Sequence, residues 1–198
     1  MSEPATIPAL KEWATIVQAL LAGEQIIDLR KGGLRERDRH FALAARRAWL
    51  YPTVEHQRAE LLKPGYRHWI DLAPASAVGD PITIAGWAEI VAHATISTAD
   101  HLDAITSKVI WTGEYAHERL QWKGRDPLWV LVLRAHRLLE PITIEWHDGY
   151  GGCTSWVDLD GLGDPTEHAS EPALSDVAFE GRWKGVRDAL PSDLWTEA

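Results

Sequence analysis

The sequence contains few of the residues that build disulfides or metal sites. Among its 198 residues there is one cysteine, Cys153, which excludes an internal disulfide and a zinc site built from cysteines. The nine histidines form neither an HExxH pattern nor an H-x-H pair. We therefore expect neither a metal ion nor a cofactor.

Long apolar runs and a targeting segment are also missing. No stretch approaches the roughly 20 apolar residues that a helix needs to span a bilayer. The first residues, MSEPATIPALKEW, have neither the basic region nor the apolar region of a signal peptide. These absences predict a cytoplasmic protein that makes no contact with membranes.

Tryptophan, in contrast, is abundant: the chain has eleven tryptophans and only two phenylalanines. Tryptophan combines a large apolar ring with an N–H donor, which suits half-buried packing and stacking platforms. We expect most of these rings to pack in the core or at its rim. Trp111, Trp122 and Trp129 flank a short helical region, and they are candidates for stacking on a base.

Charge is unevenly distributed along the chain. The formal net charge of −9 argues against a general nucleic-acid-binding surface. Residues 30–67, however, contain ten basic and four acidic residues, whereas residues 145–198 contain three basic and twelve acidic residues. Because the local field determines where an anion docks, residues 30–67 are the candidate anion-binding region.

The first third of the chain predicts both helices and strands. Apolar residues recur at helical spacing over residues 9–22, and Gly23 stands where a glycine would end that helix. Residues 26–29 predict a strand, and residues 41–52 fit a helix or a strand. Thr53 is expected to cap a helix over the next ten residues.

The remainder favours strands more strongly. Residues 82–96 alternate with period two, with Gly86 as a candidate bulge. Ser97 resembles a helix cap, and a final helix is expected from Ser175. Further elements are expected at residues 113–122 (helix) and at residues 127–139, 141–146 and 154–159 (strands).

The order of these elements lacks a regular βαβ rhythm. This predicts an α+β fold with a mostly antiparallel curved sheet, or a small barrel, flanked by helices. Residues 1–160 are expected to form a single α+β domain. Residues 161–198 are expected to form an acidic linker followed by a C-terminal helix that packs on the same domain.

Three stretches, KEWATIVQALLAGEQIIDLRKGG, LYPTVEHQ and GYGGCTSWVDL, resemble the bacterial DUF 1802 family (DUF1802) over most of residues 9–160. Some relatives occur beside restriction-endonuclease-like domains. The resemblance therefore implies a role in handling foreign DNA, within restriction-modification or another defence system.

A weaker similarity links the chain to PUA-like barrels, the class that includes ASCH and EVE domains. GWAEIVAHATI and PLWVLVLRAHRLLEPI are similar to the strands that surround the helices of such domains. PUA-like domains bind RNA or a modified base in a pocket. This similarity implies a PUA-like curved sheet with a ligand pocket.

A basic corner with two glycines is the first candidate site. Gly32 and Gly33 permit backbone conformations that expose consecutive N–H groups as an anion nest, and Arg30, Lys31 and Arg35 supply positive charge. The alternative is an ordinary hairpin end, because such tips are often charged and glycine-rich. The corner has none of the spacing of a Walker or dinucleotide-binding loop.

A second candidate group follows at Tyr51, Thr53, His56 and Gln57. Free N–H groups at the expected helix start would favour an anion, and His56 and Gln57 could contact a base edge or a phosphate. The alternative is a capped helix with Tyr51 packed beneath it. The residues alone leave both interpretations open.

Cys153, within YGGCTSW, is a candidate nucleophile because His147 and Asp148 are near it in sequence. A reactive thiolate needs a base within hydrogen-bond reach and an environment that lowers its pKa. The alternative is a small side chain that packs beside a strand, which is the more common role of a lone cysteine.

Together these features predict a non-catalytic module that recognises a nucleic acid or nucleotide. Residues 30–33 would hold phosphate, His56 and Gln57 would orient the ligand, and tryptophan would stack on a base. This depends on the basic corner sharing a concave surface with His56 and Gln57. Two alternatives remain: an enzyme that acts on nucleotides or nucleic acid, and a protein-interaction subunit of a defence system whose acidic tail docks a basic partner.

Overall fold

The computed structural model describes residues 7–31, 42–72, 79–122, 124, 126–152 and 154–198. The strands are β1 (Ala9–Trp13), β2 (Ile27–Arg30), β3 (Arg47–Thr53), β4 (Ile82–Ile96), β5 (Leu128–Ile144), β6 (Trp156–Val157), β7 (Ser170–Pro172) and β8 (Trp195–Glu197). The helices are α1 (Ala14–Leu21), α2 (Trp69–Leu72), α3 (Ala99–Thr106), α4 (Gly113–Gln121) and α5 (Asp176–Arg187). Short 3₁₀ turns lie at Ala59–Leu61, Pro64–Tyr66, Asp148–Tyr150, Pro165–Glu167 and Ser192–Leu194.

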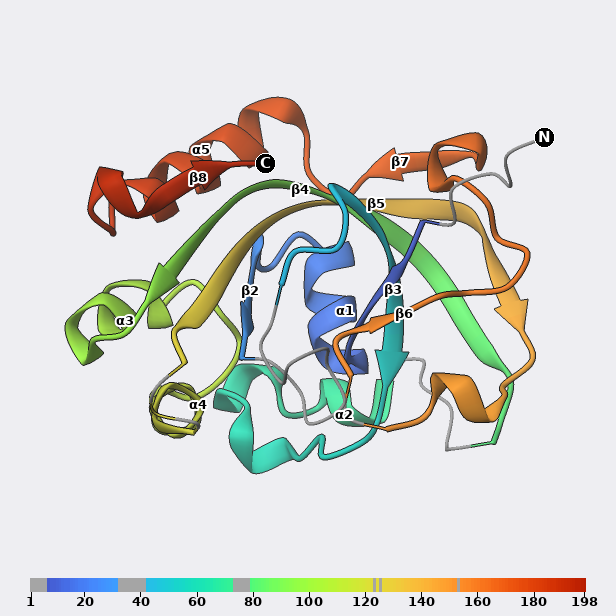
Figure 1. The fold of residues 1–198 in the computed structure, drawn as a ribbon, viewed down its shortest axis with the longest axis horizontal. Coiled ribbons are helices and arrows are strands. Elements are labelled where there is room, and N and C mark those ends of the chain that lie inside the picture. Colours follow the sequence, from blue (N-terminus) through green and yellow to red (C-terminus); the bar gives the residue numbers. More distant parts are fainter. Residues whose placement is uncertain (1–6, 32–41, 73–78, 123, 125, 153) are drawn as a thin grey trace.

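The strands form one curved sheet that arches over α1 (Figure 1). Their order is β2-β5-β4-β3-β1-β6, with β7 added beside β5 and β8 beside β4. Among the described strand pairs, β1 and β3 run parallel and the others run antiparallel. The predicted α+β fold with a mostly antiparallel curved sheet is therefore confirmed.

The two long paired strands, β4 and β5, form the centre of the arch. β4 buries alternate residues along its length, as its period-two sequence predicts. The register with β5 shifts between Ile84 and Gly86, which confirms the predicted bulge, and shifts again between Ile90 and Ala92. Bulges bend a strand and increase its twist, so these two shifts help the sheet to curve.

β5 runs as one strand where the sequence suggests two. Pro141 lies in the interval between Arg137 and Ile142 where β5 has no partner residues on β4. Since proline cannot donate to a β-ladder, this interruption is where a strand tolerates it. The strand therefore continues through the proline instead of ending there.

The N-terminal helix begins later than the apolar spacing indicates. Residues Ala9–Trp13 form β1, which is buried along its length between β3 and β6. The prediction of a helix over these residues is wrong because pairing with distant strands overrides local propensity. Gly23 has φ +70° directly after α1, which confirms the predicted glycine stop.

The helix predicted after Thr53 is also absent. β3 extends to Thr53, whose Oγ1 accepts a hydrogen bond from the backbone N–H of Glu55 at 3.1 Å. His56 then adopts φ +64°, and regular structure resumes only as the short turn Ala59–Leu61. The threonine hydroxyl thus closes a tight turn, because its local bond competes with helix formation.

The chain beyond residue 160 wraps over the outer side of the arch. β7 pairs with β5, β8 pairs with β4, and α5 lies over the convex face (Figure 1). Ser175 caps the start of α5, and its Oγ accepts from the backbone N–H of Ala178 at 3.3 Å. Phe179 and Val186 join the main hydrophobic core. The domain division at residue 160 stays a prediction.

Two further observations concern the helices. The Ser97 cap is replaced by Thr98, one residue later, which accepts from the backbone N–H of His101 at 3.3 Å. Within the described part of the chain, each helix is too short or too polar to cross a bilayer.

We expect the substitution Gly86→Ala to destabilise the fold. A Cβ atom at this position would lie 2.3 Å from the carbonyl oxygen of His136 and 2.5 Å from Leu21 Cδ2, and the backbone carbonyl cannot move away cheaply. The free energy of unfolding, measured by urea denaturation, should fall by about 2 kcal/mol. Gly65→Ala is the matched control, because a Cβ atom there meets nothing within 4 Å. Equal losses in both variants would contradict this account of Gly86.

Candidate ligand-binding pocket

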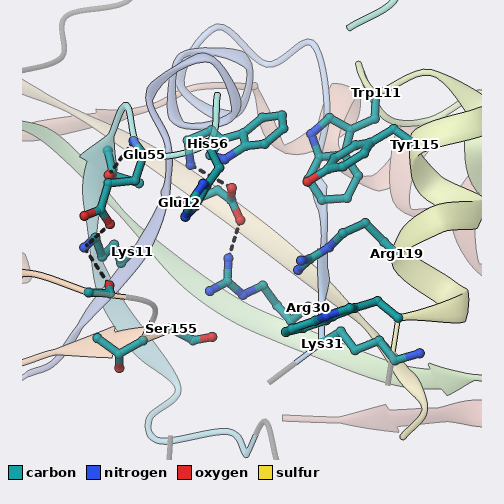
Figure 2. Close-up of a pocket in the computed structure, with 15 residues that line it drawn as sticks. Lys11, Glu12, Arg30, Lys31, Glu55, His56, Trp111, Tyr115, Arg119 and Ser155 are labelled. Atoms are coloured by element: carbon teal, nitrogen blue, oxygen red, sulfur yellow. Dashed lines mark hydrogen bonds and ion pairs between the residues drawn. The ribbon is translucent and has the colours of Figure 1, made fainter. Parts of the chain in front are cut away.

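A pocket of about 280 Å³ opens where the ends of β1 and β2 meet α4, the turn after β3 and the loop before β6 (Figure 2). β1 and β2 are separated in the sheet by β5, β4 and β3. Their ends approach one another because the sheet curves. The pocket therefore gathers side chains from segments that are distant in sequence.

Aromatic rings form one wall of this pocket. Trp13 stacks on Tyr115 with ring centroids 5.2 Å apart and planes 14° from parallel. Trp111 meets both rings edge to face, at 5.8 Å from Trp13 and 5.0 Å from Tyr115. Mutual packing of three rings fixes their orientation, so this wall is a rigid apolar surface.

Side chains of helix α4 extend this wall towards the opening of the pocket. Tyr115 and Arg119 are four residues apart and lie on one face of α4, and Trp111 lies just before the start of this helix. The Arg119 guanidinium lies 5.3 Å from the ring centroid of Trp122, at cation–π distance. Trp122 is 40% exposed. The outer part of the wall thus combines an accessible aromatic ring with a positive charge.

A buried ion pair closes the floor of the pocket. Arg30 donates from Nη1 to Glu12 Oε2, and the other carboxylate oxygen of Glu12 accepts from the backbone N–H of Trp13 at 2.7 Å. Asp28 lies behind this pair, with Oδ2 3.7 Å from Arg30 Nη1. The dashed line in Figure 2 marks the contact between Glu12 and Arg30.

Asp28 is a carboxyl group with an altered proton affinity. Burial, followed by the neighbouring charge of Glu12, raises its pKa to about 8, and the Arg30 charge only partly opposes this. Neither oxygen of Asp28 forms a hydrogen bond with any described residue. At neutral pH Asp28 therefore tends to keep its proton, and the ion pair of Arg30 is formed with Glu12.

The opposite wall is held by Lys11. Its Nζ donates to Glu55 Oε2 at 3.1 Å and to the carbonyl oxygens of Tyr150 and Gly152, both at 3.0 Å. These three bonds use all three ammonium hydrogens. Lys11 therefore connects β1 to the turn after β3 and to the loop before β6. Its ammonium group stabilises the wall of the pocket and is not available to bind a ligand.

Lys31 contributes a further cation beside Arg119. Its Nζ donates to the carbonyl oxygen of Leu120, and burial lowers its pKa. Among the described lining residues, four cations (Lys11, Arg30, Lys31 and Arg119) face two carboxylates (Glu12 and Glu55). Since Lys11 and Arg30 are held by those carboxylates, the remaining cations are Arg119 and Lys31, with the charge of Asp126 near Lys31.

Several residues singled out from the sequence do meet in this pocket. Those that line it are Arg30, Lys31, Thr53, His56, Trp111 and Trp122. Lys31 and His56, which belong to the two predicted groups, thus share one concave surface. Their role in binding a ligand stays a prediction.

Other candidates lie elsewhere. Tyr51 is buried against Tyr150, with ring centroids 6.0 Å apart. Gln57 is engaged by Thr15, whose backbone N–H and hydroxyl both donate to its side-chain oxygen, at 3.0 and 3.1 Å. Trp129 packs near His93 with a centroid distance of 5.1 Å. Gly32, Gly33, Arg35 and Cys153 fall outside the described residues.

The lining residues that sequence reasoning missed include Lys11, Glu12, Tyr115 and Arg119. The apolar spacing over residues 9–22 predicts a helix, and this prediction gives no reason to place Lys11 and Glu12 in a pocket. The recurrence of Trp111, Tyr115 and Arg119 at intervals of four residues was a usable signal. It would have placed Tyr115 and Arg119 on one face of the helix, with Trp111 just before its start.

Comparison with known proteins agrees with the family seen in the sequence. The family described as "Domain of unknown function (DUF1802)" matches residues 9–185, and the chain belongs to this family. No curated protein matches the sequence.

Solved structures of ASCH from Zymomonas mobilis are similar to this fold at a low level. The crystal structure of that protein aligns with a TM-score of 0.41 and 12% sequence identity, and covers 90% of this chain and 94% of that chain. A mutant of it with alanine in place of serine gives a TM-score of 0.40, 14% identity, and coverage of 91% and 97%. At this level of similarity, nothing about a ligand transfers to the present chain.

We expect Asp28→Asn to alter how stability depends on pH. The raised pKa means that the folded state retains a proton that the unfolded state releases above its ordinary pKa of 3.8. The stabilising contribution of this proton is thus fully present below pH 3.8 and is lost as the pH rises to about 8. Between these pH values, the free energy of unfolding of Asp28→Asn minus that of the wild type should increase by about 1 kcal/mol for each pH unit.

Urea unfolding at pH 5, 6, 7 and 8 measures this difference. Asp193→Asn, at an exposed position in a 3₁₀ turn, is the control and should follow the wild-type profile. A constant difference between Asp28→Asn and wild type at all four pH values would show that Asp28 ionises normally in the folded protein.

Proposed function

We propose that this chain is a non-catalytic recognition module that binds a nucleotide or a single-stranded nucleic acid in the pocket between β1, β2 and α4. One observation carries the proposal: rigid aromatic faces and a surplus of positive charge line the same concavity. A nucleotide has both complementary parts, because its base offers a flat π surface and its phosphate offers negative charge.

Each part of the pocket suits one part of such a ligand. Bases stack on aromatic side chains of any orientation that leaves a face accessible, and Trp122 is the most exposed ring of the wall. Guanidinium and ammonium groups bind phosphate through charge-assisted hydrogen bonds, and Lys31 and Arg119 supply these groups. His56 lies on the rim nearest the turn after β3, where it would help to orient the ligand.

Size and overall charge favour a small ligand over duplex DNA. A volume of about 280 Å³ is near the lower end of small-molecule pockets and accommodates roughly one nucleotide. The chain as a whole carries a net charge of −9, which repels the extended phosphate backbone of a duplex. A cytoplasmic location, a link to restriction or defence and a protein partner remain predictions from the sequence.

Binding to short single strands tests the proposal directly. Single-stranded RNA and DNA should quench the tryptophan fluorescence of the wild-type protein at low salt, whereas a duplex of the same sequence should bind more weakly. If two phosphate contacts form, log K should fall with log salt at a slope of about −1.4. Arg119→Met should weaken binding about tenfold, because a charge-assisted hydrogen bond is lost.

Arg187→Met is the matched control for Arg119→Met. Arg187 also lies over a tryptophan, Trp183, at 5.7 Å, but it does so on α5 and away from the pocket. Unchanged binding is expected in this variant. Failure of every strand and nucleotide to bind at low salt would refute the proposal, and conversion of a bound ligand to product would instead favour the enzyme alternative.

A further inference from the structure

Two buried donors on the α4 side of the pocket have no acceptor. Trp111 Nε1 and Arg119 Nε are closed off from solvent, and no described residue accepts a hydrogen bond from either nitrogen. Trp111 is 3% exposed, and both residues line the pocket, where Figure 2 shows them on the same side. A buried donor without an acceptor costs folding free energy, so a small shift of the side chains that cover these nitrogens would let a ligand oxygen accept and relieve that cost.

The donors cannot easily turn away to find other partners. The indole of Trp111 is held edge-on by Trp13 and Tyr115. The Arg119 guanidinium lies over the Trp122 ring, and Arg119 follows Tyr115 by four residues, about one helical turn, on the same face of α4. The two N–H groups therefore belong to a preorganised wall.

Several acceptors among the described lining residues are already engaged. Glu12 accepts from Arg30 and from the backbone of Trp13, and Glu55 accepts from Lys11. The carbonyl oxygen of Gly152 is also engaged by Lys11. Among the described lining residues, the pocket thus offers donors and surplus positive charge, and it favours a ligand group rich in acceptors.

The surplus charge distinguishes between kinds of phosphate. With Lys11 and Arg30 held by carboxylates, Lys31 and Arg119 are the two remaining cations of the described lining, and Asp126 lies near Lys31. A phosphodiester within a strand carries one negative charge, whereas a terminal phosphomonoester carries about −1.5 to −2 at pH 7. A pocket that holds roughly one nucleotide and presents two cations matches the monoester better.

We propose that the pocket selects a nucleotide with a terminal phosphomonoester, whose oxygens accept from Lys31, Arg119 and the indole N–H of Trp111. This inference rests on the proposed function and narrows it to one class of ligand. Two sources supply the same group, a free mononucleotide and the phosphorylated end of a strand.

Titrations of the wild-type protein with matched ligands test the proposal without any substitution. The probes are uridine, its 5′- and 3′-monophosphates, and a six-nucleotide RNA with a phosphate at the 5′ end, at the 3′ end, or at neither end. At least one phosphorylated probe should bind about tenfold or more tightly than its unphosphorylated counterpart, because the monoester adds charge-assisted hydrogen bonds. Equal affinity within both ligand sets would overturn the proposal.

Substitutions then assign the selectivity to this wall. Trp111→Phe keeps an aromatic ring but removes the N–H, and it should reduce the advantage of the phosphorylated probe about fivefold while changing the affinity of the unphosphorylated probe little. Lys31→Met should reduce the same advantage. Trp195→Phe is the control, since Trp195 Nε1 is also buried without an acceptor but lies outside the pocket. An unchanged advantage in both Trp111→Phe and Lys31→Met would place the phosphate elsewhere and overturn the assignment.

The outcomes separate the two proposals. If strands bind but terminal phosphate has no effect, the recognition module stands and the selectivity fails. If no probe binds, both fail. If the monophosphates bind tightly and the phosphorylated RNAs do not, the pocket is a site for a free mononucleotide. If a phosphorylated RNA binds tightly, the pocket accepts the phosphorylated end of a strand.

Discussion

The buried ion pair between Glu12 and Arg30 joins two strands, β1 and β2, that three other strands separate in the sheet. They can meet only if the sheet bends, and the register shifts in β4 contribute to that bend. Each charge is expensive to bury alone, so each side chain requires the other. The curvature of the sheet and the closure of the pocket floor are thus parts of one arrangement.

This arrangement also divides the cations of the pocket between two tasks. Arg30 and Lys11 are committed to carboxylates and carbonyl oxygens, and they hold the walls in place. Lys31 and Arg119 supply the surplus charge. The protonated state of Asp28 preserves this division, because a second carboxylate beside Arg30 would cancel part of the positive field.

The many tryptophans serve mainly as packing groups, and only a few shape the pocket. Trp49 is fully buried, Trp87 stacks on His136 with centroids 4.0 Å apart, and Trp183 meets Trp195 edge to face at 4.7 Å. Trp13, Trp111 and Trp122 are the tryptophans among the described lining residues. The same residue type therefore packs in the core at most positions and lines the pocket at three.

Elements whose pattern reflects their own burial were predictable from the sequence. The period-two alternation of β4, the β-prone run of β5 and the helical spacing of α5 each record which side of the element is covered. β1 was not predictable, because it is buried on both sides by strands that lie far away in sequence, and its apolar residues fit helical spacing equally well. The helix expected after Thr53 failed because a single side-chain hydrogen bond redirected the chain.

By itself, the sequence determined the α+β class, the bulge at Gly86 and the family. It also singled out the two groups of candidate residues to which Lys31 and His56 belong. Only the tertiary structure decided that Glu12 and Lys11 face a pocket, that Arg119 provides its surplus charge, and that Gln57 is occupied by Thr15. The reason is physical: alternation and helical spacing report burial within one element. Which side chains meet, and which charges remain for a ligand, depends on how a curved sheet brings distant strands together.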